Sequence, residues 1–248
     1  IDKKNNLIDL ILVNELSETI KKENTIVIMA GGKGLRLRPY TENCPKPMLK
    51  VNDKPILEII MEQCIEQGFR KFNISVNYLK SQIMDYFNDG TDWGVSINYL
   101  EEKMPLGTAG SLSILSPQDN PFIVINGDLL TKLNLNRILE FHNENNADIT
   151  LGVRNYVEKF PFGIINVDGI KLKSFQEKPS FNYLVNAGLY VINPSILKLI
   201  KKGIYMDMPD LIMNAKCKGY CINVCPIHEF WLDIGKPELL KKAHDEWY

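Results

Sequence analysis

The chain has 248 residues, of which 45% are hydrophobic and 24% are charged, and its formal net charge is −1. This composition excludes collagen, a coiled coil and a wholly disordered chain, and it gives no extended basic surface for nucleic acid. No stretch approaches the roughly 20 apolar residues of a membrane-spanning helix, and five cysteines in a chain of this length fit a reducing cytoplasm. We therefore expect a globular cytoplasmic protein that binds neither nucleic acid nor membranes.

Short apolar runs alternate with helical patterns from residue 25 to about residue 155. The expected strands are residues 25–30, 72–77, 95–100, 122–126 and 147–153. The expected helices between them are residues 55–67, 81–88, 108–115 and 134–146. Strands and helices in alternation predict a mainly parallel sheet with helices on both faces, which is a three-layer α/β/α sandwich.

After residue 155 the pattern changes to shorter strands that are separated by turn residues such as Asp168-Gly169. These strands are expected at residues 162–167, 170–176 and 188–192, and later ones at 219–224 and 229–234. Helices are expected at residues 194–201, 208–216 and 236–247. The shorter strands predict antiparallel additions and a mixed sheet, and residues 24–248 form one expected domain.

Residues 1–23 do not fit this scheme. They resemble the closing strand and helix of a CBS motif, and a local N-terminal extension is the alternative. The chain begins with Ile1 rather than Met, so we expect it to be a piece of a longer protein.

The strongest chemical signal is the glycine-rich loop that follows the first strand, Ala30-Gly31-Gly32-Lys33-Gly34. Glycines let backbone amides approach a phosphate closely, and strand ends in open α/β sheets bind ligands. The loop has no Gly-Lys-Ser/Thr, and Leu37 stands where a dinucleotide-binding loop has its third glycine. Arg36 and Lys46 add cations close by, so the loop suits a triphosphate.

With these motifs the sequence resembles the sugar nucleotidyltransferase (nucleotide-sugar pyrophosphorylase) family. Residues 31–41 and 45–47 match its Gly-Gly-x-Gly-x-Arg-Leu-x-Pro-x-Thr and Pro-Lys-Pro motifs, and further motifs follow in order to about residue 240. Leu35 departs from the family, which usually has Thr or Ser there. The resemblance implies a Rossmann-like nucleotide-diphospho-sugar transferase fold. It also implies attack by a sugar-1-phosphate on the α-phosphorus of a nucleoside triphosphate, with release of pyrophosphate.

The same resemblance implies roles for individual residues. Arg36 and Lys46 would be catalytic, and Asp128 and Asp233 would hold the cofactor Mg²⁺. The nucleotide would contact Ala30, Gly31, Gly32, Gly34, Asn77, Glu102, Gly107, Thr108 and Gly127. The sugar phosphate would contact Gly163, Glu177, Lys178 and Asn186.

The nucleobase and the sugar stay open. Residues 106–110 lack the Gln-rich character of the uridylyl and thymidylyl branches and look more like the mannose-1-phosphate guanylyltransferase branch, which favours GTP. The carboxylate of Glu102 is a suitable acceptor for the N1 and N2 donors of guanine. The alternatives are UTP, dTTP or CTP, or a nucleotide-sugar sensor without turnover. Family members that follow a CBS pair resemble enzymes that make GDP-amino sugars, so glucosamine-1-phosphate competes with mannose-1-phosphate, and a homo-oligomer is possible.

Three cysteines near the C-terminus are the remaining candidates for a metal site. Cys217, Cys221 and Cys225 are spaced four residues apart, which suits neither zinc nor iron–sulfur sites. We expect them to be buried thiols.

Overall fold

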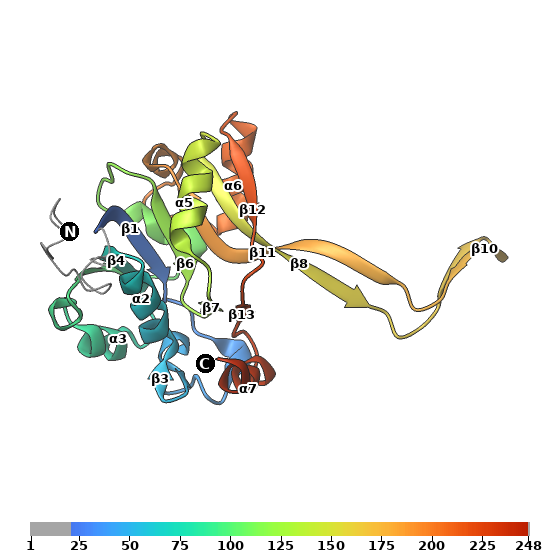
Figure 1. The fold of residues 1–248 in the computed structure, drawn as a ribbon, viewed down its shortest axis with the longest axis horizontal. Coiled ribbons are helices and arrows are strands. Elements are labelled where there is room, and N and C mark those ends of the chain that lie inside the picture. The colour runs from blue at the N-terminus through green and yellow to red at the C-terminus, as the bar shows by residue number, and fades with distance from the viewer. Residues whose placement is uncertain (1–20, 248) are drawn as a thin grey trace, which may run out of the picture.

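The computed structural model describes residues 21–247, and its centre is one seven-stranded sheet (Figure 1). The strand order is β12-β8-β11-β6-β1-β4-β5. Strand β11 is antiparallel to β6 and β8, and the other neighbours are parallel. The strands are β1 (Lys22–Met29), β4 (Phe69–Val76), β5 (Ser96–Glu101), β6 (Phe122–Asn126), β8 (Ile149–Lys159), β11 (Ser180–Ile192) and β12 (Ile222–Pro226). The expected mixed, mainly parallel sheet is confirmed.

Helices cover both faces of this sheet because successive strand residues point to opposite sides. In β1, Ile26 and Ile28 belong to one apolar cluster and Val27 to the other, and all three are fully buried. The first cluster includes side chains from α2 (Ile56–Glu66), α3 (Lys80–Phe87), α5 (Leu135–Glu144) and α7 (Pro237–Glu246). The second includes side chains from α4 (Gly107–Gly110) and α6 (Met208–Cys217). The three-layer α/β/α architecture is therefore confirmed.

Several helices are shorter or tighter than the sequence pattern predicts. The helix expected at residues 108–115 is divided into α4 and a 3₁₀ helix, Ser111–Ile114, and the one expected at 194–201 is a 3₁₀ helix, Pro194–Leu199. The amides of Ala109 and Gly110 both donate to the carbonyl oxygen of Met206, at 2.9 Å each, so a distant segment stabilises α4. Further 3₁₀ helices are Leu35–Leu37, Lys46–Met48 and Thr91–Trp93.

Short strands outside the main sheet form three small ladders among the described residues, and two of these ladders lie in the body. Strand β2 (Lys50–Val51) pairs with β3 (Lys54–Pro55), and β7 (Leu129–Thr131) pairs with β13 (Trp231–Asp233). The strand expected at residues 229–234 is thus β13, which joins β7 and not the central sheet. The strand expected at 219–224 is β12, which lies slightly later in the chain.

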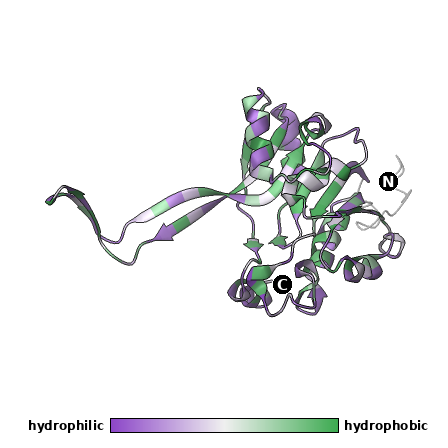
Figure 2. Cartoon of the chain, turned by 180° about the vertical axis from the view of Figure 1, so that it is seen from behind, coloured by the Kyte–Doolittle hydropathy of each residue, from purple (hydrophilic) through white to green (hydrophobic). Residues whose placement is uncertain are grey.

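A long two-stranded extension projects from the body (Figures 1 and 2). Strands β8 and β11 continue past the sheet as a ribbon, and the hairpin of β9 (Ile164–Asp168) and β10 (Lys171–Gln176) lies at its far end. We call residues 154–185 the arm. The strands expected at residues 162–167 and 170–176 are β9 and β10. The sequence predicted only the inner parts of β8 and β11, because their outer parts mix polar and apolar residues without a buried face.

Residues 1–20 lie outside the described part of the chain, so the expected CBS remnant and the boundary at residues 23 and 24 stay predictions. Within residues 21–247, no helix combines the length and the apolar character needed to cross a membrane.

Candidate active site

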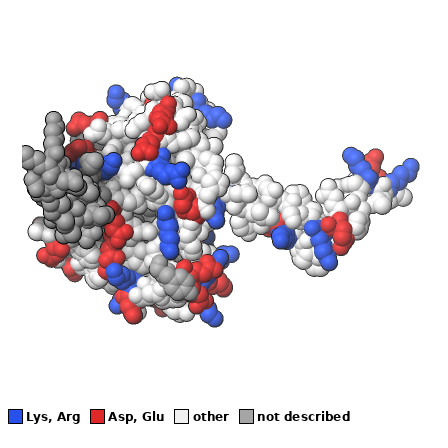
Figure 3. Space-filling model, viewed as in Figure 1, with Lys and Arg blue, Asp and Glu red and all other residues white. Residues whose placement is uncertain are grey.

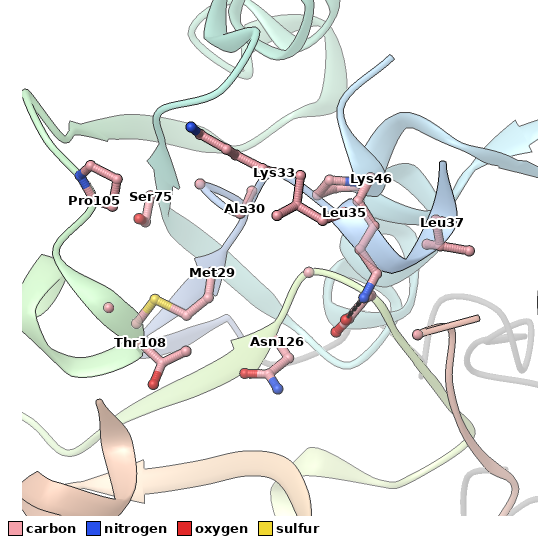
Figure 4. A pocket seen from close by; sticks show the side chains of 18 of the residues that line it. Met29, Ala30, Lys33, Leu35, Leu37, Lys46, Ser75, Pro105, Thr108 and Asn126 are labelled. Carbon is pink, nitrogen blue, oxygen red and sulfur yellow. Dashed lines mark hydrogen bonds and ion pairs between the residues drawn. The ribbon is translucent and has the colours of Figure 1, made fainter. Parts of the chain in front are cut away.

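A cavity of about 650 Å³ lies at the carboxyl ends of β1 and β6 (Figure 4). Its volume is typical of small-molecule sites, and its position is the one at which open α/β sheets bind ligands. The lining residues are those from Met29 to Leu37, together with Lys46, Pro47, Ser75, Glu102, Pro105, Gly107, Thr108, Asn126, Gly127, Asp128, Tyr205, Asp233 and Gly235. Most of the predicted nucleotide-binding, catalytic and metal-binding residues therefore meet in one place.

The glycine-rich loop brings Arg36 to the cavity. Gly34 has a φ of 61°, and its carbonyl oxygen accepts hydrogen bonds from Thr41 Oγ1 at 2.8 Å and from the amide of Leu37 at 2.9 Å. A Cβ on Gly34 would lie 3.0 Å from the Cβ of Lys46, so glycine allows the two cationic segments to approach closely. Leu37 is fully buried and anchors the turn that carries Arg36.

Lys46 and Asp128 form an ion pair inside the cavity, drawn as a dashed line in Figure 4. Their side chains are only 12% and 19% exposed, so the pair is largely shielded from water. Asp128 follows Gly127, whose amide donates to the Met29 carbonyl at 2.9 Å and thereby ties the end of β6 to the end of β1. A Cβ on Gly127 would lie 2.6 Å from that carbonyl oxygen, so this close approach requires glycine.

Pairing of β7 with β13 brings Asp233 beside Asp128. Asp233 lies opposite Leu129, and the amide of Ile234 donates to the carbonyl oxygen of Asp128 at 3.0 Å. Burial, and then the neighbouring Asp128, raise the pKa of Asp233, while Lys46 and Arg36 partly offset this rise. The two carboxylates thus share one charged pocket with two cations.

One oxygen of this group lacks a partner. Oδ1 of Asp233 is buried and has no hydrogen-bond partner among the described residues, which is costly unless a ligand satisfies it. No group of three or more His, Cys, Asp or Glu side chains in residues 21–247 could hold a metal. A pair of carboxylates nevertheless fits Mg²⁺, which typically binds one or two carboxylates and completes its coordination with water and substrate phosphates.

The carboxylate of Glu102, which also lines the cavity, is held in a fixed position. Ser75 Oγ donates to its Oε1 at 2.5 Å, and the amide of Leu106 donates to its Oε2 at 2.9 Å. Asn77 does not line the cavity, but its Nδ2 donates to the Glu102 carbonyl at 2.8 Å. A Cβ on Gly31 would lie 2.9 Å from Oε1, so glycine leaves room for this carboxylate.

Tyr205 lines the cavity and was not identified from the sequence. Its hydroxyl donates to Asp207 Oδ2 at 2.6 Å, and Asp207 Oδ1 accepts from the amide of Thr108 at 3.1 Å. The hydrogen bond from Tyr205 lowers the pKa of Asp207, and the same bond raises the pKa of Tyr205. Only the fold could reveal this contact, since about 100 residues separate the two segments.

The predicted sugar-phosphate residues do not line this cavity. Gly163 and Glu177 lie close to each other on the arm, where a Cβ on Gly163 would be 3.0 Å from Glu177 Oε2. Lys178, next to Glu177, has a φ of 43°. Asn186, at the base of the arm, donates through Nδ2 to the hydroxyl of Tyr190 at 2.6 Å. A role for these four residues stays a prediction.

The expectation of three buried thiols is wrong. Cys217 and Cys221 are exposed and Cys225 is half-buried. The reason is that Cys217 ends α6, that Cys221 lies just before β12, and that β12, which contains Cys225, is an edge strand of the sheet among the described residues.

Comparisons with known proteins agree with this fold and site. The model of the family described as nucleotidyl transferase matches residues 25–247. A mannose-1-phosphate guanylyltransferase catalytic subunit beta from Drosophila pseudoobscura pseudoobscura is 32% identical over 89% of this chain and 61% of its own length. A UTP–glucose-1-phosphate uridylyltransferase from Synechocystis is 31% identical over 85% of this chain and 60% of its own length. The chain thus spans about three fifths of these relatives.

Solved structures show the same architecture. The crystal structure of HddC from Yersinia pseudotuberculosis has a TM-score of 0.70 and 25% identity, and the match covers 91% of this chain and 100% of that one. A putative glucose-1-phosphate thymidylyltransferase from Bacillus anthracis has a TM-score of 0.71 and 20% identity, with 89% and 94% covered. By its sequence match and its fold, the chain belongs to the nucleotidyl transferase family.

Proposed function

We propose that the chain transfers a nucleotidyl group from a nucleoside triphosphate to a sugar-1-phosphate. The observation that carries this proposal is the convergence of Lys46, Asp128, Arg36 and Asp233 in one cavity at the ends of the parallel strands. Relatives of the chain include sugar-1-phosphate guanylyl- and uridylyltransferases, which supports the same reaction class.

In this reaction two polyanions must meet, so catalysis consists mainly of positioning and charge neutralisation. An oxygen of the sugar-1-phosphate forms a bond to the α-phosphorus, and the bond from that phosphorus to the bridging oxygen of the β-phosphate breaks. Lys46 would lie between the attacking phosphate and the α-phosphate, and Arg36 would neutralise the leaving pyrophosphate. The fold holds both side chains in position before substrate binds, because Lys46 is ion-paired with Asp128 and Arg36 lies on a turn that the buried Leu37 anchors.

Asp128 and Asp233 would hold Mg²⁺ together with phosphate oxygens. When bound, the ion would neutralise part of the triphosphate charge and help align it for in-line attack. It would also give the unpartnered Oδ1 of Asp233 a ligand and favour the ionised form of that carboxyl group.

We infer GTP as the nucleotide, and Glu102 supports this choice. Its two oxygens are oriented by Ser75 and Leu106, and each has a further lone pair that can accept from the N1 and N2 donors of guanine. Mannose-1-phosphate and glucosamine-1-phosphate are the two candidate acceptors. The uridylyl, thymidylyl and cytidylyl reactions are the alternatives within the same fold.

The test is pyrophosphate release from GTP, UTP, dTTP and CTP, each with both sugar phosphates and Mg²⁺. We expect GTP to be preferred, and Glu102→Gln to reduce this preference by on the order of 100-fold. A site built to hydrogen-bond one base rejects another base because its own buried polar groups are then left without partners. Equal use of UTP or CTP would overturn the guanine assignment. No release with any pair would overturn the transferase and favour a sensor without turnover.

A further inference from the structure

The hairpin β9–β10 at the end of the arm has no covering layer among the described residues. Its extensive contacts are between its own two strands, and the arm holds it away from the body (Figure 1). An isolated two-stranded hairpin is marginally stable in water and needs another layer for support.

The register of the hairpin gathers four large apolar side chains on one face. Ile165 lies opposite Phe175, and Val167 lies opposite Leu172. Directly opposed residues share a face, and Ile165 and Val167 are two apart in β9. The register shift between Leu172 and Ser174 puts their partners in β10 on that same face. These four side chains, the apolar face, are between 56% and 66% exposed.

The opposite face of the hairpin is polar except for Ile164, which lies opposite Gln176 at its inner end. Asn166 lies opposite Ser174, and its Nδ2 donates to Ser174 Oγ at 2.9 Å. Such a division into one apolar and one polar face is typical of an antiparallel sheet that is packed on one side and solvated on the other. The hairpin therefore has the pattern of a packed element, although no layer formed by residues 21–247 covers its apolar side.

The paired outer parts of β8 and β11, which carry the hairpin, keep it away from the body of its own chain. Strands β8 and β11 pair without a break from Val153 opposite Asn186 to Lys159 opposite Ser180. At about 3.3 Å per residue this ladder extends roughly 20 Å, and bending it back would break its backbone hydrogen bonds. A second molecule can reach the apolar face without any such cost.

The charges around the hairpin favour a copy of the same chain as that molecule. The hairpin and the residues that follow it carry Asp168, Lys171, Lys173, Glu177 and Lys178, and Figure 3 shows both signs together on the outer part of the arm, whose inner part is mostly uncharged. This balance gives no single-sign field of the kind that attracts nucleic acid or anionic lipid. Across a two-fold axis, mixed charges can meet opposite charges of an identical surface.

We propose that the apolar face of β9–β10 is an interface between two copies of this chain. In a two-fold contact each hairpin covers the four apolar side chains of the other, and both copies gain the layer that each lacks alone. The proposal is independent of the proposed function, because it rests on the arm and not on the cavity.

The experiment measures the molar mass of the full chain by light scattering and sedimentation velocity over a range of concentrations. In the variant Val167→Lys/Leu172→Glu, an apolar cross-strand pair becomes an oppositely charged pair, which preserves pairing within the hairpin. The control Asn166→Lys/Ser174→Glu introduces the same charges on the polar face of the same hairpin. Thermal unfolding of both variants shows that the body remains folded.

We expect the wild type and the control to be dimers. In the apolar-face variant the Kd of the dimer should rise by about 100-fold or more, because the substitutions remove apolar side chains from the centre of the interface. A monomeric wild type at concentrations well above micromolar would overturn the proposal. So would a dimer that survives in the apolar-face variant, or one that both variants weaken equally. None of these measurements needs turnover, so they are separate from any failure of the transferase assay.

Discussion

Gly107→Ala tests whether the site depends on close backbone packing between α4 and residues 204–207. Gly107 has a φ of 77°, and a Cβ there would lie 2.5 Å from the carbonyl oxygen of Met206. That oxygen cannot move away freely, because it accepts the amides of Ala109 and Gly110 at 2.9 Å each. The substitution therefore strains the backbone and also forces apart two segments that are joined by hydrogen bonds.

The two costs can be estimated separately. A left-handed backbone costs a residue with a Cβ roughly 1–2 kcal/mol, and an overpacked contact costs roughly 1–3 kcal/mol. The sum is roughly 2–5 kcal/mol. For a chain of this size, where 1 kcal/mol shifts Tm by roughly 2–4 °C, it lowers Tm by roughly 4–20 °C.

Gly94→Ala is the matched control, since Gly94 has a φ of 67° but nothing within 4 Å of its Cβ position. It should carry only the backbone cost and lower Tm by roughly 2–8 °C. Thermal unfolding followed by circular dichroism compares the two variants, and pyrophosphate release should fall in Gly107→Ala because Thr108 shifts with α4. If Gly107→Ala is no less stable than Gly94→Ala, the close approach does not constrain the site.

Four further predictions follow from the charges in the cavity. Lys46→Ala and Arg36→Ala should each lower kcat by about 10²-fold or more, since each removes a preorganised cation; a near-normal kcat would exclude that residue from the mechanism. EDTA should abolish turnover and Mg²⁺ should restore it, and full activity without divalent metal would contradict the metal site. Asp233→Asn should lose activity yet raise Tm at neutral pH. Folding raises the pKa of the Asp233 carboxyl group, so the protein loses stability as the pH rises from the pKa of the unfolded state to that of the folded state. The variant has no carboxyl group to ionise and should not show this loss. A pH dependence of Tm equal to that of the wild type would refute this. Tyr205→Phe should lower Tm at neutral pH, because it removes the hydrogen bond that depresses the pKa of Asp207 in the folded state. At a pH below that pKa the carboxyl group is protonated, and the variant should then have the Tm of the wild type. An equal loss of Tm at neutral pH and at the acidic pH would refute this.

The local parts of the site could be predicted from the sequence. The loop around Gly34 has a backbone that its glycines dictate, and Asp128 lies two residues after a buried strand, so both could be placed at strand ends before the fold was known. The approach of Asp233 to Asp128 depends on a long-range contact, and only the resemblance to a family suggested it. The ion pair between Asp128 and Lys46 also joins distant segments and was not predicted.

Other features could not be predicted because no local pattern encodes them. Tyr205 lies in a short segment without periodicity, and its place in the cavity depends on Asp207 bonding to Thr108. The strands at the end of the arm were predicted, but its outer β8 and β11 segments were missed because they have no buried face, and a buried face is what gives a strand its sequence pattern. Glu177 and Lys178 lie on the arm and do not line the cavity, which the sequence motif alone could not show.

The most direct test of the central claim is to follow oxygen through the reaction. Sugar-1-phosphate labelled with ¹⁸O in its phosphate is incubated with GTP and Mg²⁺, and both products are analysed by mass spectrometry. Attack by the sugar phosphate on the α-phosphorus predicts that the nucleotide-sugar keeps the label and that the pyrophosphate contains none. Label in the pyrophosphate, or release of GMP without a labelled nucleotide-sugar, would contradict the proposed nucleotidyl transfer.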